Sequence, residues 1–214
     1  MNKALFYAVA LSFAITLHSA VIRVDHKIPA GGNGSSWQTA FKYLQDSLAV
    51  AATGDEIWVA EGSHKPDEGT GKTVGDREAS FALVNGVRLY GGFKGTETTR
   101  NPLGDFNQTI LSGEIDGNQT SWSFHVVTGV DLDSSTVISG FRITKGNANG
   151  TLLNAMGGGI FLEKSSPKIT HCFVTENSAA FYGGGIYSVD SSPSLANCLF
   201  ARNSATYRGG GIYF

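Results

Sequence analysis

The carboxyl-terminal part of the chain repeats one short motif at a fixed interval. The glycine triplets that begin at Gly157, Gly183 and Gly209 are each followed by an isoleucine and an aromatic residue, and the two intervals between them are equal (183 − 157 = 26 and 209 − 183 = 26). A fixed interval of this length indicates a structural unit that stacks on copies of itself. Equivalent residues of successive units are therefore expected to become neighbours in an elongated array.

Several other residue types recur at the same interval. The matched positions are Ser166 and Ser192, Pro167 and Pro193, Cys172 and Cys198, Asn177 and Asn203, and the aromatic residues Phe161, Tyr187 and Tyr213. An earlier copy is looser, because Ile138 corresponds to Ile169 at a longer interval (169 − 138 = 31). The excess of five (31 − 26) predicts an extra loop within the sequence NGTLLNAM, which lies between these two copies.

The repeated unit favours β-strands over helices. Stretches such as Lys168–Val174 and Ser194–Phe200 are rich in apolar and β-favouring residues and are bounded by Pro, Asn, Gly and Ser. No amphipathic helical period runs through either unit. A unit of this length can form three short strands joined by turns, which is one coil of a parallel β-helix with coils about 4.8 Å apart. The sequence therefore predicts an all-β fold of the parallel β-helix type.

The glycine triplets and the residues that follow them predict the outer surface of the coils. Glycine adopts positive φ at little cost and lets backbones approach closely, so Gly157, Gly183 and Gly209 suit corners between strands. The isoleucine after each triplet would point inward, and strand alternation would send the next side chain outward. These outward side chains would form one file along the array, made of Phe161, Tyr187 and Tyr213.

The repeated asparagines and cysteines are expected inside the coils. Stacked Asn177 and Asn203 can hydrogen-bond from coil to coil, which satisfies amides that would otherwise be costly to bury. Cys172 and Cys198 would stack with side chains that point the same way rather than toward each other. Two cysteines in an exported protein suggest a disulfide, but this geometry predicts two free, buried thiols instead.

The first twenty residues have the pattern of a secretory signal peptide. Lys3 precedes an apolar run over residues 4–17, and the small residues Ser19 and Ala20 follow it. This run of fourteen residues (4 to 17) is too short for an ordinary membrane span, and no later segment is long enough. An uncleaved membrane anchor is the alternative interpretation. The pattern predicts a protein that is secreted or held at the cell surface or outer membrane, with no transmembrane segment after removal of the signal.

An amphipathic helix is predicted ahead of the first coil. Ser35 with Gln38 offers a capping box, and Gly54 is a plausible stop. The apolar stripe between them consists of Phe41, Leu44 and Leu48. Such a helix would cover the open end of the array, and the first strand would follow at Ile57–Val59.

The resulting domain organisation has three parts. These are a signal peptide at 1–20, a segment with the capping helix at 21–56, and a parallel β-helix at 57–214. Because the sequence ends inside a coil at Phe214, we expect the β-helix to be truncated at its carboxyl end.

Composition and charge argue against two classes of partner. The formal net charge of the 214 residues is −2, so no basic excess favours nucleic acid. The sequence EGTGKT at 68–73 is similar to the end of a phosphate-binding loop, but the pattern requires glycine where Pro66 stands. We therefore predict that the protein binds neither nucleic acid nor nucleotide, and no cofactor is expected.

Several stretches carry a resemblance to known families. The sequences SSWQTAFKYLQDSLAVAATGDEIWVAEG, SFALVNGVRLYGGFKGTE and ISGFRITKGNANG resemble the amino-terminal region of secreted right-handed parallel β-helix proteins of bacteria, which have the pectin-lyase-like fold. The later units resemble the GGA[ILV] and FxxN repeats of chlamydial-type polymorphic outer membrane proteins. Phe200–Asn203 fits FxxN, whereas Val174–Asn177 has Val in place of Phe, and the third glycine stands where that family often has Ala. The resemblance implies a right-handed β-helix.

Two functions are compatible with such a fold. The first is an exported adhesin-like scaffold that binds a polysaccharide or a host or cell-surface protein. The alternative is a polysaccharide lyase or glycoside hydrolase, and a lyase would need calcium-binding carboxylates with an Arg or Lys on one outer face. The candidate acids are Glu114, Asp116, Asp131 and Asp133, and the candidate bases are Arg88, Arg142 and Lys145. None of them repeats at the interval of the glycine triplets, so we assign no catalytic or metal-binding residue, and calcium is expected only for a lyase.

The outward aromatic file is the candidate binding feature. Flat rings at Phe161, Tyr187 and Tyr213 could stack on sugar rings or on a partner protein. The alternative is a structural role, in which the rings pack under a loop or reinforce the sheet as a ladder. The sequence leaves both interpretations open.

Overall fold

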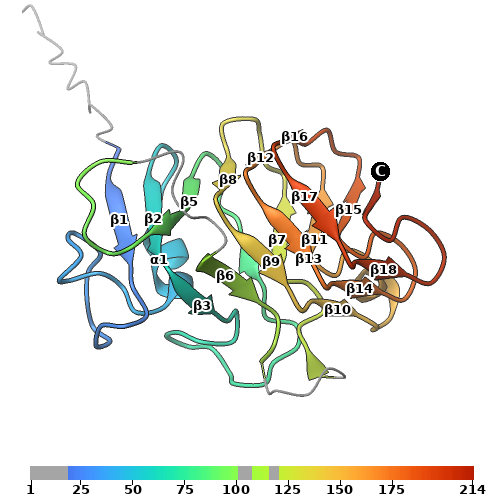
Figure 1. Ribbon diagram of the computed structural model, residues 1–214, viewed down its shortest axis with the longest axis horizontal. Coiled ribbons are helices and arrows are strands. Elements are labelled where there is room, and N and C mark those ends of the chain that lie inside the picture. The colour runs from blue at the N-terminus through green and yellow to red at the C-terminus, as the bar shows by residue number, and fades with distance from the viewer. Residues whose placement is uncertain (1–18, 101–107, 116–120) are drawn as a thin grey trace, which may run out of the picture.

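The computed structural model describes residues 19–100, 108–115 and 121–214, so the predicted signal peptide lies almost wholly outside the described residues. The described chain is mostly β, and its strands succeed one another from β1 at one end of an elongated molecule to the carboxyl terminus at the other (Figure 1). All of its strand pairs are parallel, and they form four sheets.

Two sheets contain the strands that Figure 1 shows at the top and front of the molecule. Sheet A consists of β1 (Val21–Val24), β2 (Glu56–Ala60), β5 (Arg88–Phe93), β8 (Val137–Ser139), β12 (Lys168–Thr170) and β16 (Ser194–Ala196). Sheet B consists of β3 (Gly62–His64), β6 (Thr109–Ser112), β9 (Arg142–Thr144), β13 (Phe173–Thr175) and β17 (Leu199–Ala201).

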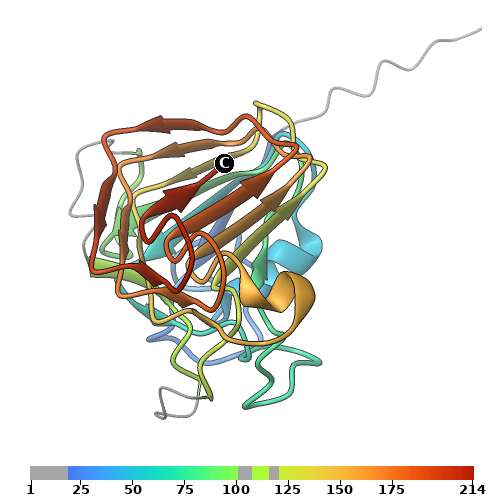
Figure 2. The same ribbon diagram turned by 90° about the vertical axis from the view of Figure 1, so that its right-hand side faces the viewer.

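The other two sheets complete the circuit of the chain. Sheet C consists of β4 (Phe81–Ala82), β7 (Val127–Val130), β11 (Ile160–Glu163), β15 (Ile186–Val189) and β19 (Ile212–Tyr213). Sheet D consists of the two-residue strands β10 (Asn147–Ala148), β14 (Ser178–Ala179) and β18 (Ser204–Ala205). From β7 onward the chain visits sheets C, A, B and D in turn and then returns to C, and we call one passage around the sheets a coil. The view along the molecule shows the coils lying behind one another (Figure 2).

The strand register confirms the repeat interval. Ile160 pairs with Ile186, and Ile186 pairs with Ile212, so positions 26 apart in sequence are neighbours. Ile138 pairs with Ile169 at the interval of 31, and the short 3-10 helix η3 (Leu152–Ala155) lies in the predicted extra loop. The all-parallel sheets and this register are consistent with a parallel β-helix.

The corners between sheets are formed by residues with positive φ, many of which are not glycine. Three files of such corner residues recur from coil to coil, with φ between 48° and 62° at every residue other than Gly140. They are Asp131, Lys164 and Asp190; Gly140, His171 and Asn197; and Lys145, Glu176 and Arg202. Because this conformation costs roughly 1–2 kcal/mol for a side-chain-bearing residue, the ladder hydrogen bonds on both sides of each corner must hold it in place.

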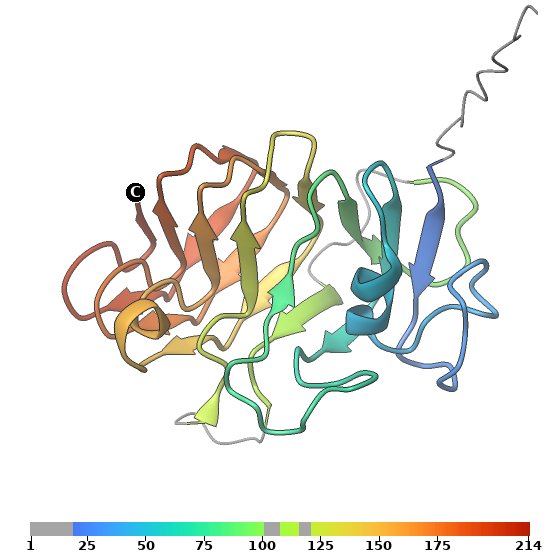
Figure 3. The same ribbon diagram turned by 180° about the vertical axis from the view of Figure 1, so that it is seen from behind.

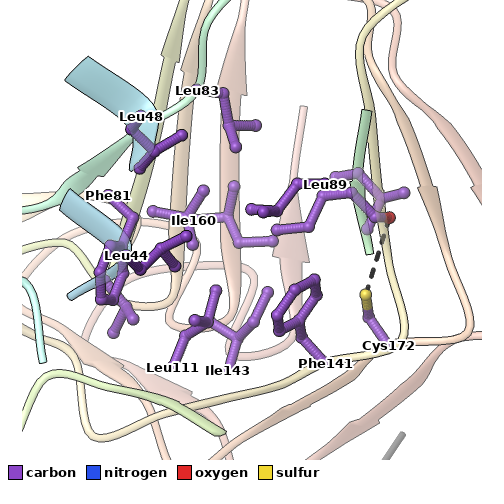
Figure 4. Close-up of a cluster of buried hydrophobic side chains, with 14 of the residues drawn as sticks. Leu44, Leu48, Phe81, Leu83, Leu89, Leu111, Phe141, Ile143, Ile160 and Cys172 are labelled. Carbon is purple, nitrogen blue, oxygen red and sulfur yellow. Dashed lines mark hydrogen bonds between the residues drawn. The ribbon is translucent and has the colours of Figure 1, made fainter. Parts of the chain in front are cut away.

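The core is one continuous apolar column inside the coils. It contains stacked isoleucines such as Ile138 and Ile169 together with larger buried side chains, including Phe81 and Phe141. Figure 4 shows part of this column, with Cys172 at its edge. Period-two alternation produces this arrangement because every second side chain of each strand points into the coil.

The single α-helix of the described chain starts later than predicted. Helix α1 spans Leu44–Val50, and no side chain caps its first turn. The predicted capping box at Ser35 and Gln38 is therefore wrong. Ser35 bonds instead with Thr39 in a local turn, while the backbone of Phe41 bonds to Arg23 beside β1. The pairing with β1 draws this segment out of the helix.

The helix takes the place of a strand in the first complete coil. It comes just before β2 of sheet A, where later coils have a strand of sheet C, and it contacts β1, β2 and β4 (Figure 3). Leu44 and Leu48 enter the core as the predicted stripe requires, and Phe41 packs at its edge. The prediction that the first strand lies at Ile57–Val59 is wrong, because β1 precedes the helix and pairs with β2.

Candidate functional site

The predicted aromatic file exists on sheet C. Phe161 pairs with Tyr187 and Tyr187 pairs with Tyr213, and their rings stack with centroids 5.7 Å and 5.8 Å apart. The planes of Tyr187 and Tyr213 differ by only 6°. The parallel register produces this stack, since it places equivalent side chains of successive coils about one strand spacing apart.

Phe161 does not belong to the exposed part of the file. Only 5% of the residue is accessible, because the ring of His125 lies 5.1 Å away and covers it. His125 is held there by a contact between its Nδ1 and the carbonyl of Gly157. The expectation of an outward, accessible ring at Phe161 is therefore wrong, and the half-exposed members of the file are Tyr187 and Tyr213.

Three further rings adjoin the file, and the sequence analysis missed them. Tyr182 stacks on Tyr213 at 4.7 Å, and the exposed rings of Phe181 and Tyr207 lie 5.3 Å apart beside it. We call this set, Phe181, Tyr182, Tyr187, Tyr207 and Tyr213, the aromatic surface. The interval between Phe181 and Tyr207, which equals that of the glycine triplets, could have revealed part of it.

A second group of side chains gathers at the corner between sheets B and D. Glu176 lies 3.4 Å from both Arg142 and Arg202, and Lys145 is paired with Glu114. We call these five residues the charged corner. Lys145, Glu176 and Arg202 are successive members of one file of positive-φ residues, so the backbone of the corner itself places them in line.

The charged corner brings together candidate residues that the sequence did not place side by side. Lys145 and Glu176 are separated by the longer interval (176 − 145 = 31), whereas Glu176 and Arg202 are separated by the shorter one (202 − 176 = 26). The file of Lys145, Glu176 and Arg202 was not recognised in the sequence because the extra loop changes the interval and because the sign of the charge alternates. Glu114, Arg142 and Lys145 are thus brought together. Three other candidates have different surroundings, because Asp131 lies on a different corner, Asp133 bonds to Ser135 and Arg88 pairs with Glu56. The remaining candidate, Asp116, lies outside the described residues.

Two hollows open beside the charged corner, each of about 250 Å³. The first is lined by Trp122, Glu176, Asn177, Ser178, Arg202 and Ser204. The second is lined by Arg142, Phe173, Thr175, Glu176, Ala201 and Arg202. Because both share Glu176 and Arg202, we treat them as one corner groove.

Comparison with known protein families identifies the group to which this fold belongs. Residues 30–205 match the model of a family described as protein of unknown function, DUF1565. The chain belongs to the DUF1565 family. No curated protein and no solved structure matches the chain significantly. The function must therefore be argued from the surfaces of this DUF1565 protein itself.

The repeated asparagines form the predicted ladder in this DUF1565 protein. Asn177 donates to the side-chain oxygen of Asn203 at 3.1 Å, and Asn203 donates to the carbonyl of Val174 at 2.7 Å. The side-chain oxygen of Asn177 accepts from the backbone of Gly146 one coil earlier. The ladder ties the inner wall of the corner together behind the groove.

The cysteines are free thiols, but they differ in burial. Cys172 is fully buried, and burial raises the pKa of its thiol well above the usual range. Cys198 is only half-buried, so the prediction that both thiols are buried is wrong for Cys198. Within this chain a coil covers Cys172 on both sides and Cys198 on one side only.

Within residues 19–100, 108–115 and 121–214, no group of three or more metal-ligating side chains gathers, and no helix is long and apolar enough to cross a membrane. One histidine is nonetheless strongly perturbed. His64 on β3 is buried, its Nε2 lies 3.2 Å from the carbonyl of Ala60, and burial lowers its pKa to about 4.

Proposed function

We propose that the protein is an exported right-handed parallel β-helix scaffold that binds a glycan or a cell-surface partner protein through the aromatic surface. The observation that supports this most directly is the gathering of four tyrosines and a phenylalanine on adjacent coils, with Phe181 38% and Tyr207 66% exposed. Exposed rings of this kind provide large contact areas at a small cost in side-chain entropy.

The rest of the molecule supports a scaffold. Sheets whose strands repeat at one interval hold the rings at fixed spacing, so the surface is preorganised for its partner. The resemblance of the GGGI and FxxN units to polymorphic outer membrane protein repeats, together with the apolar amino-terminal segment, supports a place outside the cell or on its surface.

The alternative is a polysaccharide lyase of the pectin-lyase-like type, and the charged corner is the observation that favours it. The corner places two glutamates beside two arginines and a lysine on one outer face. Each glutamate is already paired with a base, which favours binding over proton abstraction. A lyase would release unsaturated sugars from polygalacturonate or alginate in a calcium-dependent manner, visible as rising ultraviolet absorbance.

Substitution of single rings tests the scaffold proposal. We expect Tyr187→Ala and Tyr207→Ala each to weaken binding to an immobilised glycan array or to intact cells several-fold, since one stacking contact is worth about 1 kcal/mol. Tyr43→Ala is the matched control, because Tyr43 is a half-exposed tyrosine beside α1, away from the aromatic surface. Unchanged binding in both test variants would mean that the aromatic surface has only a structural role, as a ladder of stacked rings.

A further inference from the structure

The corner groove is a polar surface distinct from the aromatic surface. Its two hollows lie along the ends of β13 and β17 and the starts of β14 and β18, which Figure 1 shows side by side. Its rigid floor is the asparagine ladder, and Ser178 and Ser204 extend it in register across sheet D. The groove therefore has fixed shape across successive coils.

The charges in the groove are arranged in opposite-sign pairs. Glu176 is shared by Arg142 and Arg202, and Lys145 is paired with Glu114, so three cations face two carboxylates. Such pairing leaves little net field to attract an ion. It still presents planar groups, since a carboxylate accepts two hydrogen bonds and a guanidinium donates several.

Unsatisfied polar atoms gather at the same place. Among the described residues, nine buried side-chain nitrogen or oxygen atoms have no hydrogen-bond partner, and five of them lie in or beside the groove. The five are Trp122 Nε1, Ser123 Oγ, Arg142 Nε, Thr144 Oγ1 and Thr175 Oγ1. These atoms are enclosed by the protein, so they belong to the wall of the groove and are not open to a molecule bound in it.

One aromatic wall accompanies these polar groups. The indole of Trp122 lines the hollow that contains Ser178 and Ser204, with Lys145 Nζ 5.7 Å from its ring centre. The indole ring offers an apolar surface for C–H groups, whereas the N–H of Trp122 is buried. The groove thus combines paired planar charges, hydroxyls and one large ring.

We propose that the corner groove binds uncharged sugar units of an oligosaccharide. Neighbouring hydroxyls of a sugar both donate and accept hydrogen bonds, so they can satisfy Glu176 and an arginine at the same time. An anion could use only the donors, and the two glutamates already pair with these cations. The ring C–H groups of the sugar pack on Trp122. This inference uses none of the rings of the aromatic surface, so it stands or falls separately from the proposed function.

Calorimetry with a defined panel tests the proposal. The probes are the neutral oligosaccharides cellohexaose, laminarihexaose and chitohexaose, and the acidic polymers polygalacturonate and alginate. We expect at least one neutral probe to bind, with an affinity that changes less than about twofold between roughly 50 and 500 mM NaCl, because no ion pair forms across the interface. We expect Trp122→Ala to weaken that binding about tenfold and Glu176→Gln several-fold.

Matched controls separate the groove from general effects. Glu163→Gln removes a glutamate of the same 34% side-chain exposure, next to Lys164 on a different corner, and should leave binding unchanged. Ser204→Arg fills the groove from an exposed position and should abolish binding without loss of stability. Binding of the acidic polymers alone, a steep salt dependence, equal binding by the Ser204→Arg variant, or no binding of any neutral probe would each overturn the proposal. Loss on Tyr187→Ala but not on Ser204→Arg would assign binding to the aromatic surface instead.

Discussion

At the scale of single residues, equivalent positions in successive coils have the same partners but different accessibility. Cys172 and Cys198 each place their sulfur near the carbonyl oxygen of their own strand and of the preceding coil. Yet Cys172 is 1% exposed and Cys198 is half-buried. Equivalent positions in the repeat therefore do not have equal accessibility.

We predict that iodoacetamide labels Cys198 in the native protein much faster than Cys172. The thiolate is the reactive form, and burial both raises the pKa of Cys172 and blocks its access. Mass spectrometry after timed labelling measures the two rates. In denaturant without reductant both thiols should be labelled, whereas equal native rates or a disulfide would contradict the burial and register described for sheets A and B.

We predict that the folded protein loses stability in mild acid because His64 is buried. Its pKa is lowered to about 4 by burial, while in the unfolded chain it is near 6.5. Above pH 6.5 both states are neutral; between pH 6.5 and 4 only the unfolded state binds the proton, so stability falls as pH falls through this window. The difference corresponds to roughly 3 kcal/mol. Urea unfolding of the wild type and of His64→Gln between about pH 7 and 4.5 measures it, and identical pH dependence in both would refute this role.

At the scale of elements, the turns and corners determine where each short strand lies. The triplet that begins at Gly183 turns tightly into β15, and a Cβ at Gly183 would overlap the carbonyl oxygen of Ile186 in the same coil. Gly54, in the turn before β2, also has positive φ but has no atom within 4 Å of such a Cβ. Alanine substitutions at these two glycines therefore separate the energetic cost of positive φ from the cost of steric overlap with the backbone.

We predict that Gly183→Ala destabilises the protein clearly more than Gly54→Ala. Alanine at positive φ costs roughly 1 kcal/mol at either site, and at Gly183 the overlap with backbone adds roughly 1–3 kcal/mol more. Chemical denaturation of both variants gives the difference. Equal losses would show that the turn between Gly183 and Ile186 can open to admit a methyl group.

At the scale of the whole molecule, one connection of the stack is longer than its counterpart in the next coil, although the strands keep their register. The coil from β7 to β10 carries five residues more than its successors, and these residues form the exposed segment around η3, where Leu152 is 81% exposed. The strands on either side keep their register through this insertion. The stack therefore depends on the strands rather than on the length of the connection.

We predict that deletion of residues 150–154 leaves the fold intact. The deletion shortens the interval from 31 to 26, as in the following coil. Shortening a surface loop changes stability by about 1 kcal/mol or less. Deletion of β13 (Phe173–Thr175) is the contrasting variant, because it removes a strand that pairs on both sides. Circular dichroism and thermal unfolding should show the first variant folded and the second unfolded; the reverse would contradict the role of the register.

The sequence alone determined the features that depend on periodicity. The constant interval of the glycine triplets brings Ile160 beside Ile186 and Asn177 beside Asn203, because parallel stacking converts such an interval into direct contact. It also located the extra loop, since a longer interval must be accommodated between two strands that still pair. These are local or repeated properties that need no knowledge of the rest of the chain.

Only the tertiary structure decided what depends on contacts between dissimilar segments. Backbone hydrogen bonds that link Arg23 of β1 to Gly34 and Phe41 kept the predicted capping turn out of the helix, and His125 covered Phe161 from a part of the chain without repeat signal. The charged corner formed because positive-φ residues of three successive coils project at one edge, with Glu114 added from a fourth coil. Which side chains remain accessible is fixed by what packs over them, and that partner is distant in sequence, so no local pattern encodes it.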